Sequence, residues 1–503
     1  MPWGKTIPFD VFCEEILPYR VSTEPLENWR EKVLASFADL YKSFRDDTTL
    51  TAIEACTQVN DKLPRFRIDK DFPPMSYSQI MASTRGPCDR ISDFAVFVMR
   101  GLGIPVTFES TPQWVGLPNG HSWNSVRDSS GVHISFACAD ANPGQSHQGN
   151  TFIKVKVYRQ MYAEQQNVNL EKENVPPLLQ HINCVLDVTA EYEDCREIRF
   201  PGSDSHSLKT ETVFLAIPLE MNWYPVGWGN LDADGFQFQS VAVGLYLPVY
   251  YHNYTQTPAH YPFRLDEDGN CRFFIPDSLC KESLVLTQIN QPSPGDNQFI
   301  GRMLNGRFEG ANHSDFSDAQ LLYTITEITG AFYHSAEIRH QTSKYRYVRY
   351  VSPANGYCNV AELEFYDEND NKLRGTVIGT SRTWENSNMT CDKAFDGDID
   401  TYFDAAEGHS WAGLDLKEPR RIAKLRYLPR TVGNSIYEGC VYELFYWNGK
   451  EWDSLGRQTA TSHLLQYQAP ANALLVLKNV TKNKMYKTPF IMENGAQQWF
   501  DSN

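Results

Sequence analysis

What the sequence lacks already excludes several classes of protein. No apolar run is long enough to cross a membrane, and the opening stretch MPWGKTIPFDVFCEEILPYR has no basic segment followed by an apolar core, so we expect neither a membrane span nor a signal peptide in this chain. Lys and Arg number 46 against 62 Asp and Glu, for a formal net charge of −16. With no basic cluster, the charge argues against nucleic acid and anionic membranes as partners.

The cysteines form no recognisable framework. There are 11, with no CxxC motif and no Cys/His cluster spaced like a zinc site. Because the number is odd, at least one thiol is free if the chain is a monomer. All except Cys88 are interpreted as small core hydrophobes, and the redox compartment stays open. The chain also has no fixed-period repeat and no low-complexity tract.

The length and composition predict a multidomain, β-rich protein. A chain of 503 residues is too long for one core, so we expect three or four domains. Aromatic residues make up 13%, and 28 Pro and 31 Gly supply many turns, which is typical of β-rich chains.

Changes in pattern divide the chain into three regions. Residues 1–180 begin with helical patterns, including an apolar stripe over 27–46, and continue into strands. Residues 181–342 alternate between apolar and polar positions with frequent turns, which predicts one or two antiparallel β-domains of unknown role. Residues 343–503 show the same alternation and are predicted to be all-β.

Cys88 occupies a position that suits a reactive thiol. It follows a Gly-Pro pair and begins a predicted helix, where the partial positive charge of the helix stabilises a thiolate. His121 opens an alternating strand, and Asp140 ends the next one. Adjacent antiparallel strands can place His and Asp side by side, so the three residues are a candidate nucleophile, base and orienting carboxylate. Asp128, in the turn between the strands, is the alternative carboxylate.

Four pieces of this region resemble the transglutaminase-like superfamily, which is related to papain. In order, they are Gly86-Pro87-Cys88, Arg100-Gly101-Leu102-Gly103-Ile104-Pro105, His121-Ser122-Trp123 and Asp140. The resemblance covers roughly residues 75–145 and implies an α+β domain. It departs from the family at Asp140, which stands in ADANPG instead of a D-P-T-like context.

The resemblance implies a thiol-dependent hydrolase or acyl transferase acting on an amide bond of a peptide or glycopeptide, with no cofactor for catalysis. Cys88 would attack the carbonyl carbon, His121 would accept and return the proton, and Asp140 would orient His121. We expect a thiolate that reacts well below pH ~8.5, the pKa of a free thiol. Trp114, on the loop before His121, is a candidate substrate-binding residue.

Two alternatives to this function stay open. One is a peptide:N-glycanase-like amidase, an activity that also occurs in the superfamily. The other is a non-catalytic glycan-binding protein whose first domain is degenerate.

The last region resembles the discoidin, or coagulation factor 5/8 type C, family, whose fold is a galactose-binding-like β-sandwich jelly roll. The matching positions are Ala394, Asp396, Gly397, Thr401, Phe403, Trp411 and Leu416. The resemblance implies a structural Ca²⁺ held by Asp396, Asp398, Thr401 and a glutamate from AELEFYD, Glu364 or Glu362. Because this run precedes the loop instead of following it, the domain is predicted to be circularly permuted. An acidic turn without metal is the alternative.

The same resemblance implies a carbohydrate partner for the C-terminal region. Candidate sugar contacts are Trp384, His409 and Tyr437, which lie in predicted loops. Together the two domains resemble secreted or surface proteins of bacteria that feed on glycoconjugates. A periplasmic or cell-surface location is therefore expected, with the cytoplasm left open.

Overall fold

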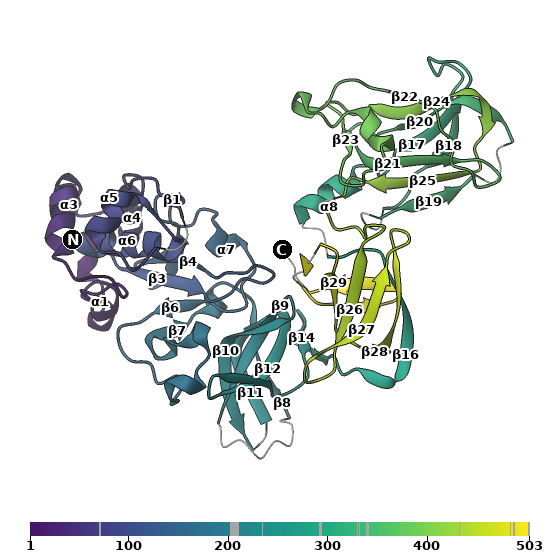
Figure 1. The fold of residues 1–503 in the computed structure, drawn as a ribbon. Helices are drawn as coiled ribbons and strands as arrows, with labels where there is room; N and C mark the ends of the chain where they lie inside the picture. Colours follow the sequence, from purple (N-terminus) through teal and green to yellow (C-terminus); the bar gives the residue numbers. More distant parts are fainter. Residues whose placement is uncertain are drawn as a thin grey trace.

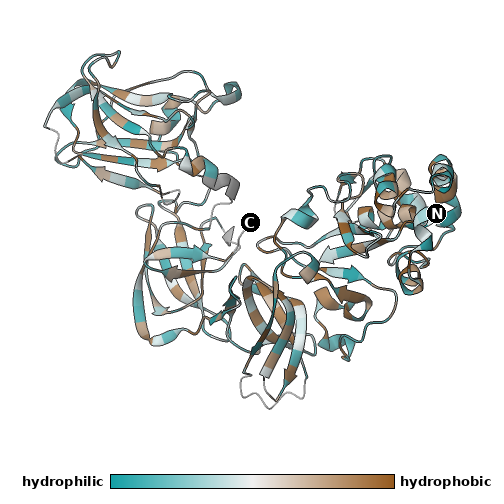
Figure 2. Ribbon diagram, turned by 180° about the vertical axis from the view of Figure 1, so that it is seen from behind, coloured by the Kyte–Doolittle hydropathy of each residue, from teal (hydrophilic) through white to brown (hydrophobic). Residues whose placement is uncertain are grey.

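A computed structural model describes residues 1–69, 72–201, 211–233, 235–290, 294–328, 330, 332–338, 342–431, 433–482, 484–485 and 488–500. It is 39% strand and 18% helix, and the strands form several sheets. Four parts of the molecule, whose ribbons Figure 1 shows, each have a hydrophobic core. Apolar residues alternate with polar ones along many strands (Figure 2). The predictions of a β-rich and multidomain protein are confirmed.

The N-terminal domain packs helices against an antiparallel sheet with the order β5-β4-β3-β6-β7. Its core centres on α6, whose apolar side chains meet those of α2 and the first strands. Gly101 allows α2 to approach closely, since a Cβ there would lie 2.5 Å from Cγ1 of Val33. The helices are η1 Pro2–Lys5, α1 Phe9–Glu15, α2 Trp29–Ser36, α3 Ala38–Asp46, α4 Ala52–Asn60, α5 Tyr77–Ser83, α6 Cys88–Gly101, α7 Gln148–Thr151, η2 Lys172–Asn174, η3 Pro177–Leu179, η4 Ile182–Cys184 and η5 Thr189–Glu191. The strands are β1 Arg67–Ile68, β2 Arg85–Gly86, β3 Val106–Thr111, β4 His121–Arg127, β5 His133–Phe136, β6 Tyr158–Gln160 and β7 Val185–Asp187.

Two local predictions in this domain have different outcomes. The stripe over 27–46 forms two helices, because Phe37 leaves the helical conformation with φ −119° and ψ 28°. The bend allows both Val33 and Phe44 to be fully buried in one core. The strand pair around the DSSG turn is confirmed, with Val126 opposite Ile134 in an antiparallel register.

A second unit consists of one antiparallel sheet with the order β15-β14-β12-β9-β10-β11-β8, and β13 pairs with β12. The predicted strand over 212–219 is confirmed as β9. Apolar side chains from β8, β9, β11, β12 and β14 form its core. The strands are β8 Cys195–Phe200, β9 Thr212–Leu219, β10 Asn222–Asp232, β11 Gly235–Ala242, β12 Gly244–His252, β13 Thr255–Pro258, β14 Phe263–Leu265 and β15 Cys271–Phe273.

A third unit is a β-sandwich, at the upper right of Figure 1. One sheet has the order β18-β17-β20-β24-β22 and the other β19-β25-β21-β23, and their inner faces share one core. Pairing of β17 with β20 carries the sandwich across residue 342, so its strands begin before the boundary expected from the sequence. The elements are α8 Pro294–Gly301, β17 Arg307–Ala311, β18 Gln320–Thr324, β19 His334–Glu337, β20 Lys344–Val351, β21 Cys358–Tyr366, β22 Thr376–Gly379, η6 Trp384–Asn386, η7 Cys391–Phe395, β23 Phe403–Asp404, β24 Trp411–Arg421 and β25 Lys424–Pro429.

The fourth unit is discontinuous in sequence. β16 pairs with β28, although the whole β-sandwich lies between them in the chain, and a second sheet has the order β27-β26-β29-β31-β32. Residues after 433 therefore belong to a separate core instead of completing the preceding sandwich. The strands are β16 Asp277–Leu286, β26 Val441–Trp447, β27 Trp452–Thr459, β28 Leu465–Ala471, β29 Leu475–Asn479, β30 Lys484–Met485, β31 Phe490–Glu493 and β32 Ala496–Trp499.

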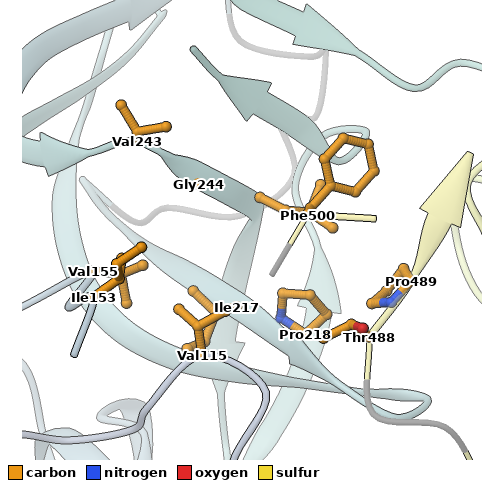
Figure 3. Close-up of a pocket in the computed structure, with 11 residues that line it drawn as sticks. Val115, Ile153, Val155, Ile217, Pro218, Val243, Gly244, Thr488, Pro489 and Phe500 are labelled. Atoms are coloured by element: carbon orange, nitrogen blue, oxygen red, sulfur yellow. The ribbon is translucent and has the colours of Figure 1, made fainter. Parts of the chain in front are cut away.

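Aromatic side chains join the second and fourth units. Trp223 of β10 packs edge-on against Trp447 of β26, with ring centroids 5.6 Å apart, and stacks with Trp452 of β27 at 6.4 Å. A small apolar cavity lies near this junction, between Ile217 and Phe500 (Figure 3). Its volume of about 20 Å³ admits nothing larger than water, which excludes it as a substrate site.

Candidate functional site

One cleft in the N-terminal domain brings together the three residues predicted from the sequence. Cys88 at the start of α6, His121 at the start of β4 and Asp140 in the turn after β5 all line a space of about 310 Å³. The other lining residues are Arg65, Phe66, Ile68, Ile91, Ser92, Ser122, Trp123, Ala137, Cys138, Ala139, His147 and Gln148. The cleft is large enough to hold part of a peptide or a small polar ligand.

Cys88 is the first residue of α6, as the sequence predicted. Pro87 precedes it in an extended conformation, with φ −69° and ψ 166°, so the helix begins abruptly at the cysteine. Burial raises the pKa of the Cys88 thiol, and the backbone N–H groups of Ser122, Asp89 and Cys88 itself oppose this rise. The direction differs from the lowered pKa expected from the sequence, because loss of water around the sulfur outweighs the helix start.

His121 is held by aromatic rings. Its imidazole stacks on Trp114 with ring centroids 5.7 Å apart and lies 6.1 Å from the ring of Trp123. Burial lowers the pKa of His121, so the ring is neutral at pH 7 and can accept a proton. Trp114 is only 2% exposed and packs behind the imidazole, so it supports His121 and is not exposed as a substrate contact.

Asp140 lies in a tight turn that a helix residue holds in place. Asn60, at the end of α4, donates from Nδ2 to the carbonyl oxygens of Ala137 and Ala141, both at 3.2 Å, and its Oδ1 accepts the N–H of Ala139 at 2.8 Å. The Asp140 side chain is exposed at the cleft. Within the described residues, no hydrogen bond joins its carboxylate to His121.

Asp128, the alternative carboxylate, does not line this cleft. It stabilises its own hairpin turn instead, accepting the N–H groups of Ser130 at 2.8 Å and Val132 at 2.9 Å.

A buried polar network supports the floor of the cleft. Trp123 donates from Nε1 to the hydroxyl of Tyr192 at 2.9 Å, and that hydroxyl donates to Glu109. Glu109 is fully buried and forms an ion pair with Arg159 at 2.6 Å. Ser125 also donates to Glu109 at 2.7 Å. The network fixes Trp123, whose ring adjoins His121.

Two further residues shape this cleft: Asn60, which no motif indicates, and His147, which lies close to the motifs in sequence but which no pattern favours over His121. Asn60 is distant in sequence from the motifs, and only the folded chain shows that it holds the turn of Asp140. His147 lines the cleft and is 7% exposed, with Nδ1 accepting the N–H of Gly149 at 3.1 Å. Its signal was the run His-Gln-Gly-Asn, in which His147 caps α7 and Asn150 returns the hydrogen bond.

In the β-sandwich, the acidic loop meets Glu362 and not Glu364. The N–H of Gly397 donates to Oε1 of Glu362 at 2.6 Å, whereas Oε2 is buried without a hydrogen-bond partner. Burial, with smaller contributions from Asp396 and Glu364, raises the pKa of Glu362 to about 7.

Glu364 lies on the same face of β21, two residues after Glu362, but its carboxylate contacts basic side chains instead of the acidic loop. It forms ion pairs with Lys372 at 2.8 Å and Arg426 at 3.0 Å, so it is not placed to serve as the metal ligand predicted from the sequence.

The loop itself is closed by its own side chains. Thr401 donates to Oδ2 of Asp396 at 2.9 Å, and Asp398 accepts the N–H of Asp400 at 3.1 Å. Within the described residues, no group of three or more His, Cys, Asp or Glu side chains is close enough to hold a metal ion.

The candidate sugar contacts do not all meet. Trp384 is 52% exposed and packs edge-on against Tyr357. The exposed His409 contacts the same loop, because its backbone N–H donates to the carbonyl oxygen of Pro353. Tyr437 lies elsewhere, because its hydroxyl donates to Asp400 at 2.9 Å and its ring packs near Ile399.

Comparisons with known proteins do not assign the chain. No protein family and no curated protein matches it. A solved structure described as a tetra-tandem repeat in the extending region of a large adhesion protein is 8% identical, with a TM-score of 0.08 over 79% of this chain and 92% of that one. A similarity this weak carries no argument. No helix in the described part of the chain is long and apolar enough to cross a membrane.

Proposed function

We propose that the N-terminal domain is a transglutaminase-like cysteine enzyme that cleaves or transfers the acyl group of an amide in a peptide or glycopeptide. The observation that supports this most strongly is the shared cleft. A thiol at a helix start, an imidazole at a strand start and a carboxylate in the turn after the next strand line the same 310 Å³ space, although they are far apart in sequence.

In the proposed reaction, the Cys88 sulfur bonds to the carbonyl carbon while His121 accepts the thiol proton. Backbone N–H groups at the start of α6 stabilise the oxyanion. When the C–N bond breaks, His121 returns the proton to the leaving amine, and the acyl group remains as a thioester on Cys88. Water or a second amine then attacks the thioester with His121 as base, which releases the thiol.

The pKa directions fit this order of events. A neutral thiol and a neutral imidazole that line one cleft do not begin as an ion pair, so the thiol needs a base during attack. Asp140 is exposed, so we assign it the supporting role of attracting and orienting the imidazolium that forms. Its removal is therefore expected to cost less activity than the removal of His121.

The test is turnover of unglycosylated peptides and glycopeptides by the full chain and by Cys88→Ala. Cys440→Ala, which removes a partly buried thiol in another unit, is the matched control. We expect Cys88→Ala to lose turnover and Cys440→Ala to keep it. Release of the glycan alone would assign the N-glycanase-like alternative. Turnover retained in Cys88→Ala, or turnover absent from the wild-type protein on all these substrates, would reject the proposal and favour a non-catalytic glycan-binding protein.

The β-sandwich is proposed to be a discoidin-like, glycan-binding module with a structural Ca²⁺. The orphaned Oε2 of Glu362 supports this, because a buried carboxylate oxygen without a donor fits a hard cation. Glu362, Asp396, Asp398 and Thr401 would hold the ion only if calcium drew them together, because these carboxylates are not close enough to one another in the described structure to form a metal site. Calcium binding measured by calorimetry should be lost in Glu362→Gln. The same resemblance supports a location outside the cytoplasm.

A further inference from the structure

A second histidine in the Cys88 cleft has an unused hydrogen-bonding atom. His147 is 7% exposed and lines the cleft, and its Nε2 is buried without a hydrogen-bond partner. Leaving a buried polar atom unpaired costs free energy, so such an atom in a cleft calls for an explanation.

The other ring nitrogen determines which hydrogen His147 carries. The N–H of Gly149 donates to Nδ1 at 3.1 Å, so Nδ1 presents a lone pair and the proton of the neutral ring is on Nε2. Burial, together with the nearby His121, lowers the pKa of His147 to about 4, although Asp140 opposes this. The ring is therefore a neutral N–H donor at pH 7.

Close contacts hold the ring in a fixed position at the wall of the cleft. His147 caps α7 from both sides, since its backbone N–H donates to Oδ1 of Asn150 at 2.9 Å. Gly149 packs so closely that a Cβ there would lie 2.8 Å from Cε1 of His147 and 2.5 Å from Cδ2 of Trp123. The donor is thus fixed before any ligand binds, which lowers the cost of binding.

We propose that His147 donates a hydrogen bond from Nε2 to an amide carbonyl oxygen of the substrate in the Cys88 cleft. A neutral donor beside the carboxylate of Asp140 suits a neutral oxygen better than an anionic one. The inference rests on the proposed function for the identity of the cleft, and it adds a residue that contacts substrate.

The test compares two alkylating reagents at Cys88 of the full chain. Iodoacetamide carries an amide carbonyl, whereas allyl iodide has the same leaving group, a similar size and no hydrogen-bond acceptor. Mass spectrometry of the Cys88 peptide gives both rate constants, and their ratio reports recognition of the carbonyl independently of thiol reactivity.

Two variants distinguish the proposed donor role of His147 Nε2 from the role of the side chain in capping α7. His147→Asn keeps an oxygen that can cap α7 but does not reach the position of Nε2, whereas His147→Gln places an amide N–H near that position. His133→Asn is the control, because His133 pairs with Glu15 and lies outside the cleft.

We expect the iodoacetamide-to-allyl-iodide ratio to fall about fivefold in His147→Asn, to recover in His147→Gln and to stay unchanged in His133→Asn. A ratio within twofold of the wild type in His147→Asn would overturn the inference, as would an equal fall in all three variants. Failure of the proposed function is recognised separately, since Cys88 of the wild type would then react with allyl iodide no faster than Cys440.

Discussion

Replacing Glu362 with glutamine should stabilise the β-sandwich at pH 8 in the absence of divalent cations. The carboxylate is fully buried, one oxygen accepts the N–H of Gly397, and the other has no hydrogen-bond partner. At this pH the folded protein therefore holds a charge that it cannot solvate, and glutamine removes that charge while keeping the shape of the side chain.

The pKa of Glu362 gives the magnitude. It is about 7 in the folded protein against 4.5 for an ordinary glutamate, so the folded state binds the proton more tightly. Protonated Glu362 therefore contributes about 3 kcal/mol to the free energy of unfolding of the sandwich. This contribution is complete below pH 4.5 and is lost as the pH rises through 7. The free energy of unfolding of Glu362→Gln should exceed that of the wild type by this amount at pH 8, and the difference should vanish near pH 4.5.

Scanning calorimetry of the full chain in chelator, at pH 8 and pH 4.5, measures the effect, and amide exchange in β21 identifies the transition of the sandwich. Glu364→Gln is the matched control, since its charge is already paired with Lys372 and Arg426 and its removal should destabilise. Calcium should restore stability to the wild type and not to Glu362→Gln. A Glu362→Gln protein no more stable than the wild type at pH 8 would refute the reasoning.

Three further predictions concern the N-terminal domain. Glu109→Ala should lower the free energy of unfolding by about 3–5 kcal/mol, because Arg159 loses its fully buried partner. Amide-exchange protection in β3 and β4 measures this loss, and a value under about 1 kcal/mol would contradict the prediction. Gly149→Ala should destabilise by about 1–3 kcal/mol and alter tryptophan fluorescence, since its Cβ would clash with Trp123, and unchanged thermal unfolding and fluorescence would count against it. The acidic limb of the kcat/KM profile should have its midpoint below pH 6.5, because burial lowers the pKa of His121, and a midpoint above that value would show that another group controls it.

The sequence was most informative where chemistry and local structure coincide. The Gly-Pro entry to α6 and the alternation around the DSSG turn are local signals, and they correctly placed Cys88 at a helix start and His121 at a strand start. The period of two places Glu362 and Glu364 on one face of β21, so the sequence alone does not say which of the two carboxylates meets the loop.

Long-range pairing was the part that the sequence could not supply. β16 and β28 pair across an inserted β-sandwich, and no local pattern announces a partner so far along the chain. The contact of Asn60 with the turn of Asp140 is also long-range, and no local pattern predicts it. The pKa of Cys88 also depends on burial by distant segments, which is why an argument from the helix start alone gave the wrong direction.

The central claim is that His121 acts as the base for Cys88. The most direct measurement is the rate constant for iodoacetamide alkylation of Cys88 at pH 7 in the wild type and in His121→Ala, with unfolding followed in both proteins. We predict that Cys88 reacts faster than Cys440 in the wild type and at least about tenfold more slowly in His121→Ala, without loss of the fold. An unchanged rate in a folded His121→Ala protein would contradict the claim.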